Sequence, residues 1–239
     1  MFFLLSGEGS TDVGLGDHAG VCRGADFKYG PMTAIVDRIV DKAHQYSILA
    51  FEACGFVSES DLAGRASELK TAKKSVRLPG IKTPKETRYF FNTARVLARI
   101  ALEREAEQDE EIIAVLFRDS DGTASANRGL WSDKRQSMVH GFEEENCGRG
   151  VPMIPKPKSE AWLLCATKAN PYIDCDTLED SSGNDKSPNS LKNQLVACFA
   201  VPPNRENLAE MVMDGTIDID RIQMPSFKAF RDRLVAVLV

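Results

Sequence analysis

The sequence predicts an α/β fold, in which a mostly parallel sheet carries helices on both faces and a helical extension closes the chain. Three observations support this prediction. Short apolar runs of strand length alternate with longer segments of helical periodicity. Polar turns rich in glycine, serine and aspartate follow several of the apolar runs. The repeated order of strand, helix and strand is typical of a parallel sheet covered by helices.

The first half of the chain is expected to contribute two strands and two helices. "FFLLS" predicts a short buried strand, because it is a continuous apolar run that ends at Gly7. Ile35, Ile39 and Val40 fall on one face of a helix, which predicts a helix after the opening loop. The expected elements are a strand at 2–6, a polar glycine-rich loop to about residue 31, a helix at 31–45, a strand at 46–52 ("YSILAFE") and a long helix from 84 to about 108.

The second half repeats this alternation and then becomes helical. "EIIAVLF", residues 111–117, is the clearest strand of the chain, and the turn "RDSDG" follows it. The further elements expected are a helix at 128–145, a strand at 151–155, a helix at 158–168 and two or three closing helices that include 226–238. We therefore divide the chain into a main domain at 1–170 and a helical C-terminal extension at 171–239, packed on it.

Composition narrows the class of protein. The formal net charge of −5 argues against a protein that coats nucleic acid by bulk attraction. The six cysteines are scattered without a C-x-x-C pair, which favours reduced thiols in a cytoplasm. "MFFLLSGEG" lacks a basic n-region, and the sequence has no apolar stretch long enough to cross a bilayer. We expect a cytoplasmic protein with no membrane role.

A basic stretch at 65–88 interrupts this acidic chain. It holds eight lysine and arginine residues against two glutamates. Such a stretch can contact the phosphate backbone of a nucleic acid, or it can be the solvated face of a helix, and the sequence leaves both open. Residues 56–83 are interpreted as a basic insertion in the main domain.

The loop after the first strand, "GEGSTDVG", carries two glycines and two carboxylates. A dinucleotide-binding fingerprint would need a third glycine where Asp12 stands, and a P-loop would need Lys and Ser or Thr where Leu15 and Gly16 stand. What remains is Glu8 and Asp12, hard oxygen ligands at the carboxyl end of a predicted parallel strand, which favours a metal. The alternative is a polar turn in which Asp12 caps a helix.

A second pair of acids, Asp119 and Asp121, follows the clearest strand in "VLFRDSDG". In an extended backbone, side chains two residues apart point the same way, so both carboxylates can converge on one divalent cation. Asp-Ser-Asp-Gly is also ordinary turn chemistry, so a simple turn stays open as the alternative.

A third segment, "PKPKSEAWLL", places Lys156, Lys158 and Glu160 at a strand-to-helix junction. The functional interpretation is that Glu160 completes an acidic cluster while a lysine meets a scissile phosphate. The alternative is that Ser159 caps the helix and Glu160 only interacts with the helix dipole. Because a parallel sheet gathers its strand ends along one edge, three such segments after three strands favour a shared site.

These three segments together resemble the Toprim fold over roughly residues 1–170. The pattern of that fold is a glutamate in a glycine-rich loop after the first strand and an Asp-x-Asp after a later one. "LLSGEGSTD" and "VLFRDSDG" match this order, and "IPKPKSEAWLL" is similar to a segment of the small proteins akin to OLD-family nucleases. By position, Glu8 matches the Toprim glutamate and Asp12 the second acid of the OLD-like first motif. Asp119 and Asp121 match the Asp-x-Asp, and Glu160 the further acid of the OLD-like proteins.

The resemblance implies a nuclease that hydrolyses phosphodiester bonds with Mg²⁺ or Mn²⁺, since the chain shows neither a zinc module nor room for strand-passage domains. Two ions would act, one to make hydroxide from water and one to stabilise the leaving oxygen. The expected metal ligands are Glu8, Asp12, Asp119, Asp121 and Glu160, and the expected catalytic residues are Glu8, Asp119, Asp121, Lys156 and Lys158. The substrate would be DNA or RNA, and the resemblance also implies a bacterial anti-phage or toxin system with an ATPase as protein partner.

Two alternative functions stay open. "DSDGT" also resembles the nucleophile motif of haloacid dehalogenase-like phosphatases, in which Asp119 would be the nucleophile and Asp121 the acid-base partner. That motif usually opens its domain, whereas here a strand-helix-strand unit precedes it. The other alternative is a non-catalytic Toprim-like module that only binds a partner.

Overall fold

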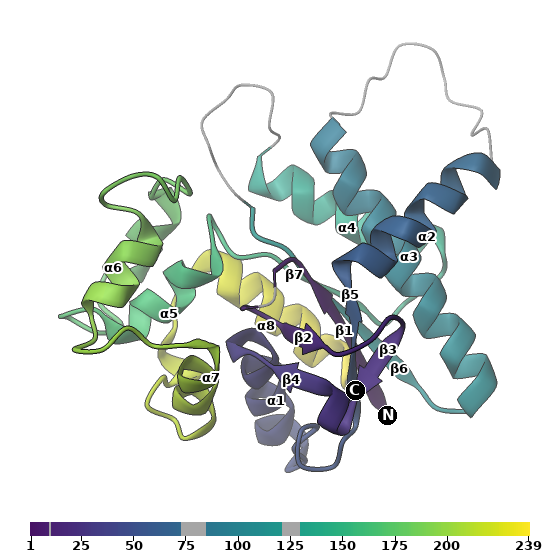
Figure 1. Cartoon of the computed structure of the whole chain (residues 1–239), viewed down its shortest axis with the longest axis horizontal. Helices are drawn as coiled ribbons and strands as arrows, with labels where there is room; N and C mark the ends of the chain where they lie inside the picture. The colour runs from purple at the N-terminus through teal and green to yellow at the C-terminus, as the bar shows by residue number, and fades with distance from the viewer. Residues whose placement is uncertain (10, 73–84, 121–129) are drawn as a thin grey trace.

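The computed structural model describes residues 1–9, 11–72, 85–120 and 130–239 (Figure 1). Its centre is a five-stranded sheet in the order β3-β5-β1-β6-β7. The parallel strands are β1 (Phe2–Gly7), β5 (Cys54–Ser58), β6 (Ile112–Phe117) and β7 (Gly150–Met153), and the short edge strand β3 (Val21–Arg23) runs antiparallel to β5. The predicted α/β fold with a mostly parallel sheet is confirmed.

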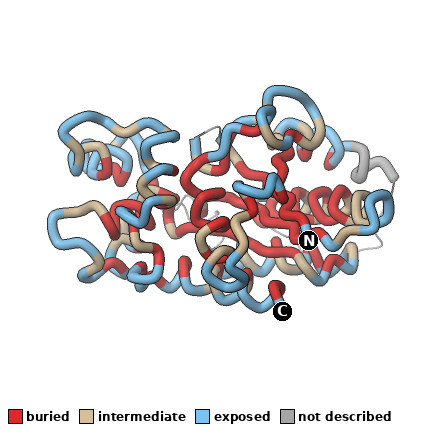
Figure 2. Tube along the Cα trace, turned by 90° about the horizontal axis from the view of Figure 1, so that it is seen from below, coloured by how far each residue is buried: buried red, intermediate tan, exposed pale blue. Residues whose placement is uncertain are grey.

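Strand β1 lies at the middle of the sheet because its apolar run can be buried on both faces. Phe3 and Leu5 belong to the core on one face, and Phe2 and Leu4 belong to the core on the other. Successive side chains of a strand alternate in direction, so one run of apolar residues supplies both cores. Figure 2 shows the buried part of the chain passing through the centre of the molecule, with exposed segments around it.

Helices cover both faces of the sheet, as the two cores require. The face of Phe2 is covered by α2 (Glu59–Ala72), α3 (Lys85–Gln108) and α4 (Trp131–Glu144). The face of Phe3 is covered by α1 (Pro31–His44), α5 (Ser159–Thr167) and helices of the C-terminal extension. In Figure 1, α2, α3 and α4 lie together on one side of the sheet and α1 and α8 on the other.

The C-terminal extension shares its core with the sheet. It comprises η2 (Cys175–Asp180), α6 (Leu191–Ala197), α7 (Arg205–Met213), η3 (Ile219–Arg221) and α8 (Pro225–Val237). The indole of Trp162 on α5 donates a hydrogen bond to Ser226 Oγ over 2.8 Å, and its ring packs against Phe227 and Phe230 with centroids 5.0 and 5.8 Å away. Helix α5 is therefore held in place by α8, and the extension is part of what positions α5.

The predicted strand at 46–52 is wrong, because this segment forms turns. The carboxylate of Asp37 accepts hydrogen bonds from Ser47 Oγ over 2.8 Å and from the Leu49 N–H over 3.0 Å, and Glu52 has a left-handed φ of 51°. Side-chain acceptors of this kind compete with a strand ladder for the backbone donors. The second parallel strand is instead β5, so residues 56–58 of the expected insertion belong to the central sheet.

The opening loop contains more regular structure than its sequence predicts. In addition to β3, it holds β2 (Gly14–Gly16), η1 (Gly24–Asp26) and β4 (Phe27–Tyr29), and β2 pairs with β4 as a two-stranded antiparallel sheet. Gly14 has a φ of 143°, and a Cβ there would lie 2.4 Å from the Lys28 carbonyl oxygen. Three-residue strands are too short to show a period, which is why the sequence did not predict them.

The cysteines differ from the expectation of reduced thiols. Cys165 on α5 and Cys175 on η2 form a disulfide, with Cα atoms 5.2 Å apart. Cys22, Cys54 and Cys147 are buried free thiols, and Cys198 is exposed. The prediction is therefore wrong for two of the six cysteines, because η2 folds back against α5 in a way that their spacing does not reveal. Within the described ranges, no helix has the length and apolar character to cross a membrane.

Candidate functional site

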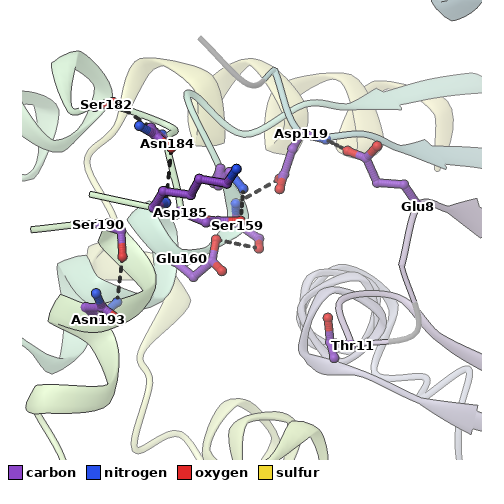
Figure 3. Close-up of polar contacts among 12 residues, drawn as sticks. Glu8, Thr11, Asp119, Ser159, Glu160, Ser182, Asn184, Asp185, Ser190 and Asn193 are labelled. Carbon is purple, nitrogen blue, oxygen red and sulfur yellow. Dashed lines mark hydrogen bonds and ion pairs between the residues drawn. The ribbon is translucent and has the colours of Figure 1, made fainter. Parts of the chain in front are cut away.

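The candidate site lies at the carboxyl edge of the sheet, where β1, β6 and β7 end side by side. Gly7 pairs with Phe117, and Phe117 pairs with Met153. The residues that follow these three strands must therefore emerge at one edge. Figure 3 shows Asp119 between Glu8 and Ser159, with Glu160 beside Ser159.

Glu8 contacts the segment that follows β6. Its Oε1 accepts a hydrogen bond from the Asp119 N–H over 2.6 Å, and its Oε2 lies 3.2 Å from Arg118 Nη1. These bonds fix the carboxylate beside the main chain of the predicted Asp-x-Asp. The sequence motif and the structure thus agree on which two loops meet here.

Asp119 is the most strongly perturbed acid of this edge. Its Oδ1 accepts a hydrogen bond from the Ser159 N–H over 2.9 Å, at the first turn of α5. Burial raises the pKa of Asp119 well above its usual value, and the charges of Asp12, Glu8 and Glu160 raise it further. Those three carboxylates therefore lie close enough to repel it.

Asp12 and Glu160 complete the group. Asp12 Oδ1 accepts a hydrogen bond from Ser159 Oγ, and its Oδ2 accepts one from Thr11 Oγ1 over 3.2 Å. Burial raises the pKa of Asp12, although the bonds from Ser159 and Thr11 and the charge of Lys158 oppose the shift. Burial also raises the pKa of Glu160, and the charge of Asp12 adds to it. Ser159 thus contacts acids from both earlier loops, so it links the three segments.

The backbone of Asp12 is positioned by helix α1. The Asp12 carbonyl accepts the N–H of Met32 over 3.0 Å, in the first turn of α1. Gly30 lies so close that a Cβ there would be 2.3 Å from the Asp12 carbonyl oxygen. A residue larger than glycine at position 30 would therefore displace the loop that carries this acid.

The two predicted lysines have different surroundings. Lys158 is buried, and its Nζ lies 2.9 Å from Asp185 of the extension, while its charge lowers the pKa of Asp12 and of Glu160. Lys156 Nζ lies 3.3 Å from Asp180 and 4.0 Å from Glu179, so its ammonium pairs with the extension. The structure therefore brings Lys158 to the acids, and it turns Lys156 toward η2.

Arg118 is a site residue that sequence reasoning missed. Its side chain is only 2% exposed, its Nη1 lies 2.9 Å from Glu59 as well as near Glu8, and its guanidinium stacks 4.4 Å from the Tyr89 ring. Among the residues that the structure describes, its Nε and Nη2 are buried without a hydrogen-bond partner. Glu8 and Glu59 compensate the charge of this buried arginine, and its pairing with Glu8 makes it part of the acidic edge. The only signal in the sequence was an arginine directly before Asp119 at the end of an apolar strand.

Lys134 is a second missed residue. It lies on α4, is 1% exposed, and its Nζ donates a hydrogen bond to the Ser120 carbonyl. It therefore places a buried cation against the main chain at Ser120, just after β6. The helical pattern of α4 gave no indication of it, because a lysine inside a helix usually faces solvent.

Part of the predicted ligand set cannot be placed. Asp121 lies outside the described residues, as do residues 73–84 of the basic stretch. Of that stretch, Arg65 on α2 pairs with Glu103 at 3.2 Å on the surface. Among the described side chains, no three of histidine, cysteine, aspartate and glutamate stand in an arrangement that could hold a metal ion.

Comparisons with protein-family models, with curated proteins and with solved structures found no match. The resemblance to the Toprim fold therefore stays a prediction that depends on the three motifs. The chemistry of this edge has to be inferred from its own side chains.

Proposed function

We propose that this chain is a metal-dependent phosphodiesterase, a nuclease whose active site is the carboxyl edge of the sheet. The observation that carries the proposal is the convergence of acids from three separate loops. Glu8 bonds to the main chain of Asp119, and Ser159 bonds to both Asp12 and Asp119. Partly buried carboxylates that repel one another lower the stability of the fold, so a cation that they bind in common would offset that cost.

The donor set fits a divalent cation of the magnesium type. Carboxylate oxygens are hard ligands, and the described edge offers them from Glu8, Asp12, Asp119 and Glu160, to which the sequence adds Asp121. Divalent ions bound there would supply Lewis acidity toward a phosphodiester and a water of lowered pKa, in the two-ion arrangement expected from the resemblance. The carboxylates as placed would have to draw together on binding, since no three of the described ones form a metal-holding group.

The remaining groups of the chain have definable tasks. Arg118 orients Glu8, which is then available to hold or move a proton at the edge of the site. Lys158 is the better placed of the two lysines to neutralise charge on a phosphoryl group, because its charge already acts on Asp12 and Glu160. Lys156, paired with η2, is a weaker candidate.

The broader biological role follows from the resemblance alone. A nucleic acid substrate, DNA or RNA, is proposed on the Toprim-like motifs and on the basic stretch at 65–88. A place in a bacterial anti-phage or toxin system and an ATPase partner are proposed on the resemblance, whereas a cytoplasmic location and the absence of a membrane role are proposed on composition. The disulfide between Cys165 and Cys175 is unusual for a reducing compartment and gives the location a direct test by thiol labelling in cells.

Metal binding and cleavage test the proposal together. Calorimetry with Mn²⁺ should show saturable binding to the full chain and none to the Asp119→Asn variant. Plasmid DNA and a structured RNA should be cleaved only when Mg²⁺ or Mn²⁺ is added. Binding of Mn²⁺ without cleavage of either substrate would refute the proposed nuclease activity. If the protein binds neither Mg²⁺ nor Mn²⁺, the non-catalytic Toprim-like module is the correct interpretation.

A further inference from the structure

A hollow lies at the edge of the sheet opposite the acids, where β7 begins. It has a volume of about 550 Å³ and is walled by α4, by the turn before β7 and by α8 of the extension. Each of the two helices contributes one arginine to it, Arg135 from α4 and Arg233 from α8. Val139, Phe142 and Cys147 supply apolar surface. A pocket of this size and mixed lining is typical of a site for a small ligand.

Arg233 is oriented by two carbonyl groups, and Glu143 is the carboxylate that lines the hollow with it. Its Nε donates to the Gly150 carbonyl over 2.9 Å and its Nη2 donates to the Gly148 carbonyl over 2.7 Å. Among the described residues it forms no ion pair with a carboxylate. Carbonyl dipoles orient the guanidinium but do not neutralise it, so its positive charge acts on the hollow.

Arg135 brings a second positive charge to the same space. It is half-buried, and within the described ranges its side chain has neither a hydrogen-bond nor an ion-pair partner. Burial lowers the pKa of Arg233, and the charge of Arg135 lowers it further, while Cys147 and Glu143 oppose the shift. The hollow thus holds two guanidinium groups against the one carboxylate of Glu143, and this excess of positive charge favours an anion.

We propose that this hollow binds a phosphate monoester of nucleoside size, with the phosphate between Arg135 and Arg233 and the remainder against Val139 and Phe142. A phosphate is favoured over a carboxylate because its three terminal oxygens can accept from both guanidinium groups at once. Gln136 and Asn146 also line the hollow and add amide groups that can hydrogen-bond a sugar or a base. The site is separate from the acidic edge, so it does not depend on the proposed nuclease activity.

The test is calorimetric titration of the full chain in EDTA, with AMP, adenosine and inorganic phosphate as probes. AMP should bind with a Kd below about 1 mM, and adenosine or phosphate alone should bind at least about tenfold more weakly. Arg135→Gln should weaken AMP binding by about 10- to 100-fold, the effect of losing hydrogen bonds between charged groups. The matched control is Arg231→Gln, which removes a charge from α8 outside the hollow and should leave AMP binding unchanged, as should Asp119→Asn.

Arg135→Gln is the decisive variant because Arg135 makes no hydrogen bond or ion pair to the described part of the chain, whereas Arg233 bonds to two carbonyls. Absence of saturable AMP binding up to about 1 mM would overturn the proposal. So would an Arg135→Gln variant that binds AMP like the wild type, or adenosine that binds as tightly as AMP. Phosphate that binds as tightly as AMP would also overturn it, since the body of the ligand would then contribute nothing.

Discussion

Replacing Asp119 by asparagine should stabilise the metal-free protein and abolish its response to metal. The Ser159 N–H can still bond to the Oδ1 of asparagine, so the packing of α5 is retained. What disappears is a carboxylate that burial and three neighbouring acids hold at a raised pKa. Because Asp119 is partly buried, solvent screens this repulsion less than it would at the surface.

The sign of the effect follows from the direction of the shift. A carboxyl group whose pKa is raised in the folded state contributes no penalty below its ordinary pKa of 3.8, and the penalty grows as pH rises from there through the raised pKa. Each unit of elevation costs about 1.4 kcal/mol once the pH exceeds both values. For a domain of this size, about 1 kcal/mol corresponds to about 2–4 °C in Tm. The variant should therefore melt several degrees above the wild type at neutral pH, and the difference should shrink as the pH is lowered.

The assay is thermal unfolding in EDTA and in excess Mn²⁺, from about pH 5 to pH 8. In EDTA the variant should be the more stable protein. In Mn²⁺ the order should reverse, because a ligand at about 100 times its Kd stabilises the protein that binds it by about 2.7 kcal/mol. Asp232→Asn, on the surface of α8 and paired there with Lys228, is the control and should melt like the wild type in both buffers. A Tm for Asp119→Asn at or below that of the wild type in EDTA would refute the idea that the acids repel one another.

Three further predictions address the acids and the cations around them. Glu8→Gln should lower the rate of nucleic-acid cleavage about 100-fold or more with Mg²⁺ or Mn²⁺, as expected for an acid-base group. If Glu8→Gln instead hydrolyses p-nitrophenyl phosphate normally while Asp119→Asn is inactive on it, the chain is a phosphatase of the haloacid dehalogenase type. Arg118→Gln should move the acid limb of the pH profile of kcat/KM to higher pH, because Glu8 loses the cation that favours its charged form. Arg118→Lys should shift this limb part of the way back. If Arg118→Gln leaves the acid limb at the wild-type pH, Arg118 has only a structural role. Charge reversal of four basic residues should weaken nucleic-acid binding and flatten its salt dependence without affecting Mn²⁺ binding, and an unchanged salt slope would assign the stretch to solvent or a protein partner. Those four residues are Lys70, Lys73, Lys74 and Arg77.

The sequence predicted the parts of the fold that local patterns determine. Strands β1 and β6 are continuous apolar runs, and helix α1 has a clear apolar face, so each was found within a residue or two. Strand β5, "CGFVS", was missed because it is short, contains a glycine and follows a more apolar segment at 46–52. That segment is turned by Asp37, a residue on the preceding helix, and such a contact is visible only once the chain has folded.

In the candidate site, too, some features could be predicted from the sequence and others depend on contacts that form only on folding. Glu8, Asp12, Asp119 and Glu160 were predictable because strand ends of a parallel sheet meet at one edge. The environment of Arg118 could not be predicted, since Glu59 lies far from it in sequence. Only the pairing of β5 with β1 brings α2, which carries Glu59, close to Arg118. Lys156 and Lys158 are two residues apart in one loop, and their different directions are set by Asp180 and Asp185 of the extension.

The extension therefore acts on the acidic edge through α5 and through Lys158. Ser159, the first residue of α5, bonds to Asp12 and Asp119, and Trp162 one turn later is packed against α8. Because the position of Ser159 depends on how α5 lies against α8, the spacing of acids from the first and sixth strands is tied to helices formed by the last third of the chain. The same helix α8 carries Arg233 at the opposite edge of the sheet. One packed helix thus contacts both the support of the acidic edge, through Trp162, and the arginine-lined hollow, through Arg233.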